Sequence, residues 1–412
     1  LLAGDRAAQL DTSAAEQHYR RALELYADDE TGRATAHAHL AAVLSQRGHF
    51  DEAIDLYERA IPVLSASDPP RAGVALQGLG TALWFRGDAD AAQKLTYEAV
   101  ATLERYPGPE LVAAYGAAAH RAGIAGRLDE ASVWAEKGLR LAAELGVEDV
   151  MALTMARAIV LGYSGDPECV AVSREARELG LRLGLGRSTA VATNNLAETI
   201  YVYESIPASL EMWDEAIAFS RSRGVTEAVM WQGGERLKAL YHLGRWDELV
   251  ERGTEVLSWA RDHAAGQLAV LVQIHLAEVL MHRGDVAEAD RLVTALVPVA
   301  RESGDPQVVV PGLAVAALVT WMQGDGEQAV ELVAELEKLT RSSTGWRSTC
   351  LLWPARVAVE SGRLGLAESF LDGTDDRAVW NACARRSARA VLAEARGERD
   401  DAARLFREAA GA

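Results

Sequence analysis

Small and apolar residues recur at helical spacing behind a turn glycine in the stretch RGHFDEAIDLYERAI, residues 47–61. Gly48 is followed by an aromatic residue and an acidic pair, and Ala53, Tyr57 and Ala60 then fall on one face of a helix with a 3.6-residue period. Glycine readily adopts the positive φ that ends a helix, and acidic side chains in a first turn complement the helix dipole. The stretch therefore predicts one helix that ends at Gly48 and a second helix that begins directly after it.

The same joint recurs along the whole chain at intervals of 35 to 40 residues. The equivalent positions are Gly48, Gly87, Gly126, Gly165, Glu204, Gly244, Gly284, Gly324, Gly362 and Gly397. Strand signals are nearly absent, because the alternation of period two never persists between turn clusters. So regular a spacing identifies an array, and it predicts an all-α chain of about ten helix-turn-helix units.

One continuous solenoid over residues 1–412 is expected, since each unit buries its apolar face only against its neighbours. Within it we expect a partial first repeat at 1–27, irregular middle repeats at 148–243 and a terminal helix at 398–412. The first repeat carries only the second-helix half of a unit, so its partner helix is expected before residue 1. The chain is accordingly interpreted as a piece of a longer protein or as a processed product.

The unit that ends in Gly87 resembles the tetratricopeptide repeat, whose signature places small and aromatic residues around a helix-turn-helix. The matching positions are Leu79, Gly80, Leu83, Gly87, Ala92 and Ala99. The resemblance covers essentially the whole chain, although the period exceeds the usual 34 residues. It implies a right-handed, tetratricopeptide-like superhelical solenoid, whose first helices line a concave surface.

Charge and cysteine content narrow the possible partners and the compartment. Sixty acidic residues against 42 basic ones give a net charge of −18, which argues against direct contact with nucleic acid or an anionic membrane surface. Cys169, Cys350 and Cys383 are far apart, which favours a reducing, cytoplasmic setting. The most apolar run, Val308 to Trp321, is shorter than a spanning helix and predicts a buried one.

The chain contains no phosphate-binding loop, dinucleotide fingerprint, HExxH motif or nucleophile elbow. We therefore predict a non-catalytic protein without a cofactor. One constellation deserves a second interpretation, because His275, Glu278 and His282 share a helical face with the spacing of metal ligands. A polar inner face explains the same residues, so no metal is predicted and these three are retained only as an alternative site.

The resemblance implies that exposed inner positions of the first helices contact a ligand or partner in the concave groove. These candidates are Asn194, Glu198, Tyr201, Lys238, Tyr241, Glu278, Trp84, Trp321 and Arg356. Aromatic rings mixed with hydrogen-bonding groups suit a protein, a peptide or a small-molecule effector. The aromatic residues also suit packing between helices. Asn194, Glu198 and Lys238 are the stronger candidates, because packing polar or charged side chains between helices without a partner is costly.

The opening residues, LLAGDRAAQLDTSAAEQHYRRALELY, resemble the junction that follows the ATPase core in MalT-like and LuxR-type bacterial regulators. Similar junctions occur in ATPase-linked nucleotidyl cyclases. This resemblance implies a sensor or scaffold region of a larger bacterial signal-transducing ATPase that regulates transcription. The alternatives are a free-standing adaptor for peptides or proteins and the regulatory region of a cyclase.

Overall fold

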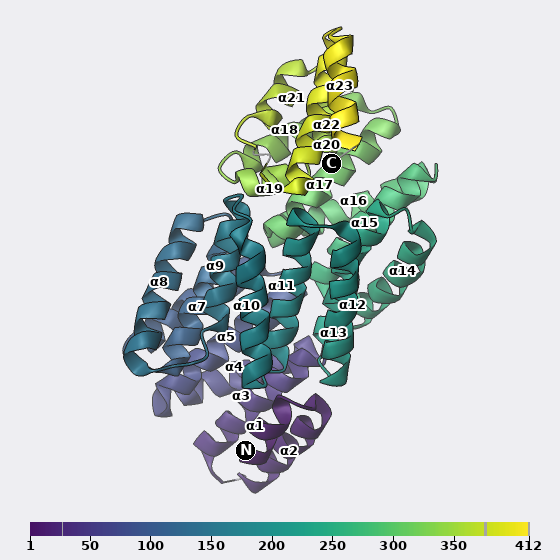
Figure 1. Ribbon diagram of the computed structural model, residues 1–412. Coiled ribbons are helices and arrows are strands. Elements are labelled where there is room, and N and C mark those ends of the chain that lie inside the picture. Colours follow the sequence, from purple (N-terminus) through teal and green to yellow (C-terminus); the bar gives the residue numbers. More distant parts are fainter. Residues whose placement is uncertain (27, 375–376, 411–412) are drawn as a thin grey trace.

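The computed structural model describes residues 1–26, 28–374 and 377–410, and within them the secondary structure is entirely helical. The first helices are α1 (Leu2–Ala8), α2 (Thr12–Leu25), α3 (Glu30–Gln46), α4 (Phe50–Ser67), α5 (Pro69–Arg86), α6 (Ala89–Leu103), α7 (Pro109–Ile124) and α8 (Leu128–Leu145). The middle of the chain forms α9 (Met151–Tyr163), α10 (Glu168–Leu183), α11 (Arg187–Tyr203), α12 (Ile206–Ser222), α13 (Thr226–His242), α14 (Trp246–Asp262), α15 (Gly266–His282) and α16 (Val286–Ser303). The last part forms α17 (Pro306–Met322), α18 (Gly326–Thr340), α19 (Thr344–Thr349), α20 (Leu352–Glu360), α21 (Leu364–Leu371), α22 (Val379–Ala395) and α23 (Arg399–Ala410). The predicted all-α solenoid of helix-turn-helix units is confirmed (Figure 1).

Each predicted joint lies between two helices, and the local sequence explains why. At Gly87 the backbone adopts a φ of 102°, and its N–H donates back to the carbonyl groups at the end of α5. Asp88 then caps α6 by accepting a hydrogen bond from the backbone N–H of Ala91. Glu204 replaces glycine at one joint with a negative φ of −121°, and the Ser205 side chain caps α12 there instead. A serine cap thus maintains the joint where the glycine is missing.

Small residues let the two helices of a unit approach closely. Ala53 and Ala92, five residues after their glycines, are fully buried. A methyl group added at Gly80 would lie 3.1 Å from the carbonyl oxygen of Ala92, so the α5 and α6 backbones leave little room for a larger residue. The conserved spacing in the sequence therefore reflects the close contact of paired helices.

The first unit differs from the expectation in one respect. The seven-residue helix α1 packs against α2, where the side chain of Tyr19 is buried and its hydroxyl donates a 2.8 Å hydrogen bond to Asp5. Residues 2–8 thus contain a helix that packs against α2, which the sequence analysis did not predict because so short a helix shows too little periodicity. That a partner helix precedes residue 1 stays a prediction. Residue 27, the predicted end of this unit, and residues 411–412, the last of the predicted terminal helix, lie outside the described residues.

The apolar run in the second half of the chain forms α17, and the prediction of a buried helix is confirmed. Apart from Pro306, Gln307, Pro311, Trp321 and Met322, all of its residues are buried. In the part of the chain that the structure describes, no helix combines the length and apolarity needed to cross a membrane.

The array coils so tightly that its successive superhelical turns touch (Figure 1). Helix α3 contacts α13, α5 contacts α15, α9 contacts α19 and α11 contacts α22. The Thr12 hydroxyl donates a 2.7 Å hydrogen bond to the carbonyl oxygen of Gly224, 212 positions away. The inner helices therefore face another part of the same chain.

Candidate functional site

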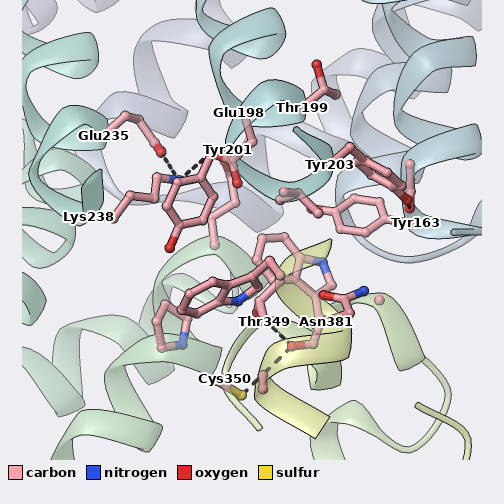
Figure 2. A pocket seen from close by; sticks show the side chains of 18 of the residues that line it. Tyr163, Glu198, Thr199, Tyr201, Tyr203, Glu235, Lys238, Thr349, Cys350 and Asn381 are labelled. Carbon is pink, nitrogen blue, oxygen red and sulfur yellow. Dashed lines mark hydrogen bonds and ion pairs between the residues drawn. The ribbon is translucent and has the colours of Figure 1, made fainter. Parts of the chain in front are cut away.

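A cavity of about 510 Å³ lies between the inner helices and the C-terminal part of the chain. One wall comes from α9, α11, α13, α15 and α17, with one residue each from α7 and α10, and the other comes from α19, α20, α22 and the Cys350–Leu351 link. Figure 2 shows this arrangement, with Tyr201 and Lys238 on one side and Thr349 and Asn381 on the other. The volume is in the range of small-molecule and cofactor pockets.

Six of the nine predicted contact residues line this cavity. They are Asn194, Glu198, Tyr201, Lys238, Tyr241 and Glu278. They come from α11, α13 and α15, three successive first helices, because equivalent inner positions of neighbouring units stack side by side. The helical register of the sequence was therefore sufficient to place these side chains together.

The other three predicted residues are not brought to the cavity. The Trp84 indole donates a 2.6 Å hydrogen bond to Asp305 and packs against Trp231 with ring centroids 4.8 Å apart. Trp321 is half-buried against the core, which is the packing alternative for an aromatic residue. Arg356 is exposed and lies 4.0 Å from Glu360 on the same helix. Trp84 lies on α5, which does not line the cavity, whereas Trp321 and Arg356 lie on lining helices, α17 and α20, at positions outside the lining.

The charged centre of the cavity is an ion triad. Lys238 Nζ lies 2.5 Å from Glu198 Oε2 and 2.5 Å from Glu235 Oε2, as the dashed lines of Figure 2 show. Burial opposes the charge on Lys238, but the two carboxylates outweigh it and raise its pKa. Burial also raises the pKa of Glu198, although Lys238 opposes that shift. Glu235 was not among the predicted residues, and its signal in the sequence was its position three residues before Lys238 on one helix.

Asn194 and Lys238 have structural partners as well as an open side. Asn194 Oδ1 accepts a 3.2 Å hydrogen bond from the indole of Trp213, a fully buried side chain. Lys238 Nζ also lies 5.4 Å from the ring centroid of Trp213. Replacing either residue is therefore expected to lower stability as well as to change the cavity.

The alternative metal site is not assembled as the helical spacing suggested. His275 Nδ1 and Glu278 Oε2 lie 2.9 Å apart, whereas His282 Nε2 lies 2.7 Å from the Tyr241 hydroxyl. Among the described residues, no group of three histidine, cysteine or carboxylate side chains is placed to hold a metal ion. The pKa of His242, the residue that follows Tyr241, is lowered to about 4, chiefly by burial.

Aromatic rings from both walls meet across the cavity. The ring of Tyr163 lies 5.4 Å from that of Trp346, and Tyr201 lies 5.5 Å from Trp380. Trp353 lies 5.5 Å from the ring of His282. Trp346, Trp353 and Trp380 were not among the predicted residues, and their signal in the sequence was the occurrence of three tryptophans between residues 346 and 380.

On opposite walls of the cavity, the largely buried residues Tyr201 and Asn381 have side-chain polar groups without a hydrogen-bonding partner among the described residues. Tyr201 is 7% exposed, and its hydroxyl receives and donates no hydrogen bond there. Asn381 is also 7% exposed, and its side-chain amide is in the same situation on the opposite wall. Buried polar groups are normally paired, so these two are available to a bound molecule.

Comparisons with known proteins agree with this architecture. One tetratricopeptide-repeat model matches residues 1–66, and a second matches residues 73–95 and 270–293. The chain therefore contains tetratricopeptide repeats in these segments, within its array of helix-turn-helix units. A search of curated protein sequences gave no significant match.

Several solved structures share the fold at low sequence identity. A Rap protein complexed with Competence and Sporulation Factor is 14% identical, over 83% of this chain and 97% of that one, with a TM-score of 0.59. NprR in complex with its cognate peptide NprX is 11% identical, over 84% and 98%, with a TM-score of 0.56. The Rap conjugation gene regulator of plasmid pLS20, in complex with the Phr* peptide, is 13% identical, over 68% and 77%, with a TM-score of 0.51. At these identities the similarity concerns the fold.

Proposed function

We propose that this chain is the effector-binding region of a regulatory protein and that the effector binds in the cavity between the two superhelical turns. The observation that carries the proposal is the cavity of about 510 Å³, where inner-face polar residues meet aromatic rings from a distant part of the chain. A pocket that is mostly apolar and contains a few convergent polar groups is typical of a ligand site.

The effector is proposed to be a small molecule or a short peptide. The similar folds of a Rap protein with its factor and of NprR with its peptide support this size class, since both are complexes of such arrays. An effector in this cavity contacts both walls at once. Its binding therefore stabilises the contact between the C-terminal helices and the inner helices, which gives the region a way to report occupancy.

The kind of larger protein to which this region belongs is proposed from the opening residues of the chain. Their resemblance to the junction of MalT-like and LuxR-type regulators supports a sensor region, one continuous unit over residues 1–412, within a larger cytoplasmic ATPase-type regulator of transcription. A free-standing adaptor and the regulatory region of a nucleotidyl cyclase are the alternatives. An ATPase domain in the coding sequence upstream of Leu1 would favour the first context.

Binding in the cavity is tested with the neutral fluorescent probe N-phenyl-1-naphthylamine, whose emission rises in apolar surroundings. Ala314 lies on the cavity wall, and Ala314→Phe reduces the available volume. The matched control is Ala403→Phe on the exposed face of α23. We expect saturable binding to the wild type and the control, and at least tenfold weaker binding to a folded Ala314→Phe variant. Unsaturable emission, or equal affinity for all three, contradicts the proposal.

A further inference from the structure

We propose that the ligand of the cavity carries a protonated amine on an aromatic or apolar body and that the amine binds beside the carboxylates of Glu198, Glu235 and Glu278. This inference rests on the function proposed above, since it specifies the chemistry of the molecule bound in the same cavity.

The charges on the cavity wall are unbalanced in favour of acid. Three carboxylates, Glu198, Glu235 and Glu278, face the cavity together with a single lysine, and no arginine occurs among the described lining residues. Glu198 and Glu235 share the single Lys238, so with both carboxylates ionised the triad carries one net negative charge. Burial raises the pKa of Glu198, and a cation bound in the cavity favours its ionised form. A buried excess charge is costly, and a cation supplied by the ligand reduces that cost.

Histidines do not remove this imbalance at neutral pH. His242 is held neutral because burial lowers its pKa to about 4. His275 is paired with Glu278 at 2.9 Å, and so it offsets at most that one carboxylate. His275 therefore does not change the balance of charge at the Glu198–Lys238–Glu235 triad.

Hydrogen-bond acceptors for an ammonium group lie on both walls. Tyr201 and Asn381 are residues that are more than nine-tenths buried, and the Tyr201 hydroxyl and the Asn381 side-chain carbonyl have no hydrogen-bonding partner among the described residues. Both oxygens accept a hydrogen bond from N–H. The Tyr201 ring already has Lys238 Nζ 5.6 Å from its centroid, so its electron-rich face lies at a place where positive charge is stabilised.

The aromatic side chains provide surface for the rest of the ligand. Trp380 contacts both Tyr201 and His242, with ring centroids 5.5 and 4.5 Å apart, and the Trp346 ring packs near Tyr163. An anionic ligand has much less support, because Lys238, the one lysine among the described lining residues, already binds two carboxylates. The combination therefore favours a hydrophobic amine over a neutral or acidic molecule of the same shape.

The test compares three probes of similar size, namely 4-phenylbutylamine, 4-phenylbutan-1-ol and 4-phenylbutyrate. Each is titrated into the full 412-residue chain by calorimetry at neutral pH and low salt, and also as a competitor of N-phenyl-1-naphthylamine. We expect the amine to bind at least tenfold more tightly than the alcohol and the butyrate to bind most weakly. Added salt should weaken the amine more than the alcohol.

Glu198→Gln and Tyr201→Phe separate charge recognition from the shape of the cavity. Glu198→Gln should reduce the preference for amine over alcohol at least fivefold and leave alcohol affinity within twofold, while Tyr201→Phe should weaken amine binding threefold or more. Glu331→Gln, at an exposed position of α18, is the matched control and should change neither. Melting temperatures measured for each variant identify any loss of folding. Glu278→Gln is a second variant that, like Glu198→Gln, removes one carboxylate from the cavity.

The outcomes distinguish this inference from the proposed function. Equal affinity for the three probes, or tightest binding of the butyrate, overturns amine recognition while leaving ligand binding in place. Absence of heat with all three probes, together with no saturable binding of the naphthylamine, overturns both.

Discussion

The indole Nε1 of Trp346 donates a 2.7 Å hydrogen bond to the carbonyl oxygen of Ile124, although the two residues are 222 positions apart in the sequence. Ile124 ends α7, and Trp346 belongs to the short helix α19. Both residues line the cavity. The contact that joins two superhelical turns therefore also forms part of the wall of the candidate site.

Trp346→Phe should loosen this contact, because phenylalanine keeps an aromatic ring at the position but has no N–H group to donate. The Ile124 carbonyl loses its donor, which costs about 1 kcal/mol when the group remains buried. Hydrogen exchange measured by mass spectrometry should become faster in α19 and α20. The control is Trp134→Phe, since the Trp134 indole donates within its own helix, 3.2 Å to Glu130. Faster exchange in α19 and α20 of the control, or none in Trp346→Phe, would show that the inter-turn hydrogen bond has no such role.

Gly48 and Gly284 form a second matched comparison, because their φ angles are 88° and 87°. A methyl group at Gly48 would lie 2.4 Å from the Trp259 ring of the neighbouring superhelical turn, whereas nothing lies within 4 Å of one at Gly284. Gly284→Ala should cost about 1 kcal/mol for the left-handed conformation alone. Gly48→Ala should cost about 1 to 2 kcal/mol more, because the Trp259 ring must move.

Melting temperatures of the two alanine variants decide this prediction. The Trp259 ring is stacked on His263 with centroids 4.3 Å apart, so it cannot turn aside without losing that contact. Equal shifts for the two variants would mean that the close approach of the Trp259 ring to Gly48 adds nothing to the cost of the alanine substitution.

The sequence predicts the repeat and the inner face because both depend on short spacings. Glycine joints, first-turn acidic residues and small residues such as Ala53 act within one unit, and the shared register aligns Tyr201 with Tyr241 in the next unit. Six predicted residues consequently line one cavity. Their role in binding stays a prediction.

The opposite wall of the cavity could not be predicted in the same way. Whether Trp346 or Trp380 reaches the inner face depends on the superhelical pitch, which sums small rotations over many units. A small error per repeat displaces residues about 200 positions apart by a whole helix. For the same reason, the pattern placed Trp84 and Trp321 on the inner face without showing which other part of the chain would cover them.

Arg187 and Glu227 form an ion pair in which the Glu227 carboxylate is almost fully buried. Arg187 Nε lies 2.6 Å from Glu227 Oε1, and the Glu227 side chain is 2% exposed. Burial raises the pKa of Glu227, and Arg187 opposes that rise. Arg187→Met should therefore destabilise the protein by about 3 kcal/mol at neutral pH, because it leaves a buried carboxylate unpaired.

The pH dependence of this variant follows from the direction of the shift. Without Arg187 the folded-state pKa of Glu227 rises further above its unfolded value, so stability relative to the wild type should fall as pH rises from about 4.5. Glu227→Gln in the same chain should restore much of the loss. Urea midpoints of the two single variants and the double variant measure the coupling; an additive double variant would refute it.

His120 should make the wild type less stable in mild acid. Burial, with further contributions from Arg121 and Arg187, lowers its pKa to about 4 from the ordinary value of 6.5. The neutral imidazole is therefore favoured in the folded state, and its contribution is complete above about pH 6.5 and lost as pH falls toward 4. Between about pH 7.5 and 5.5 the loss should be on the order of 1 kcal/mol.

His120→Gln should make the urea midpoint less dependent on pH over this interval, whereas His18→Gln at an exposed position should not. A wild-type pH slope that His120→Gln leaves unchanged would assign the acid sensitivity to other groups.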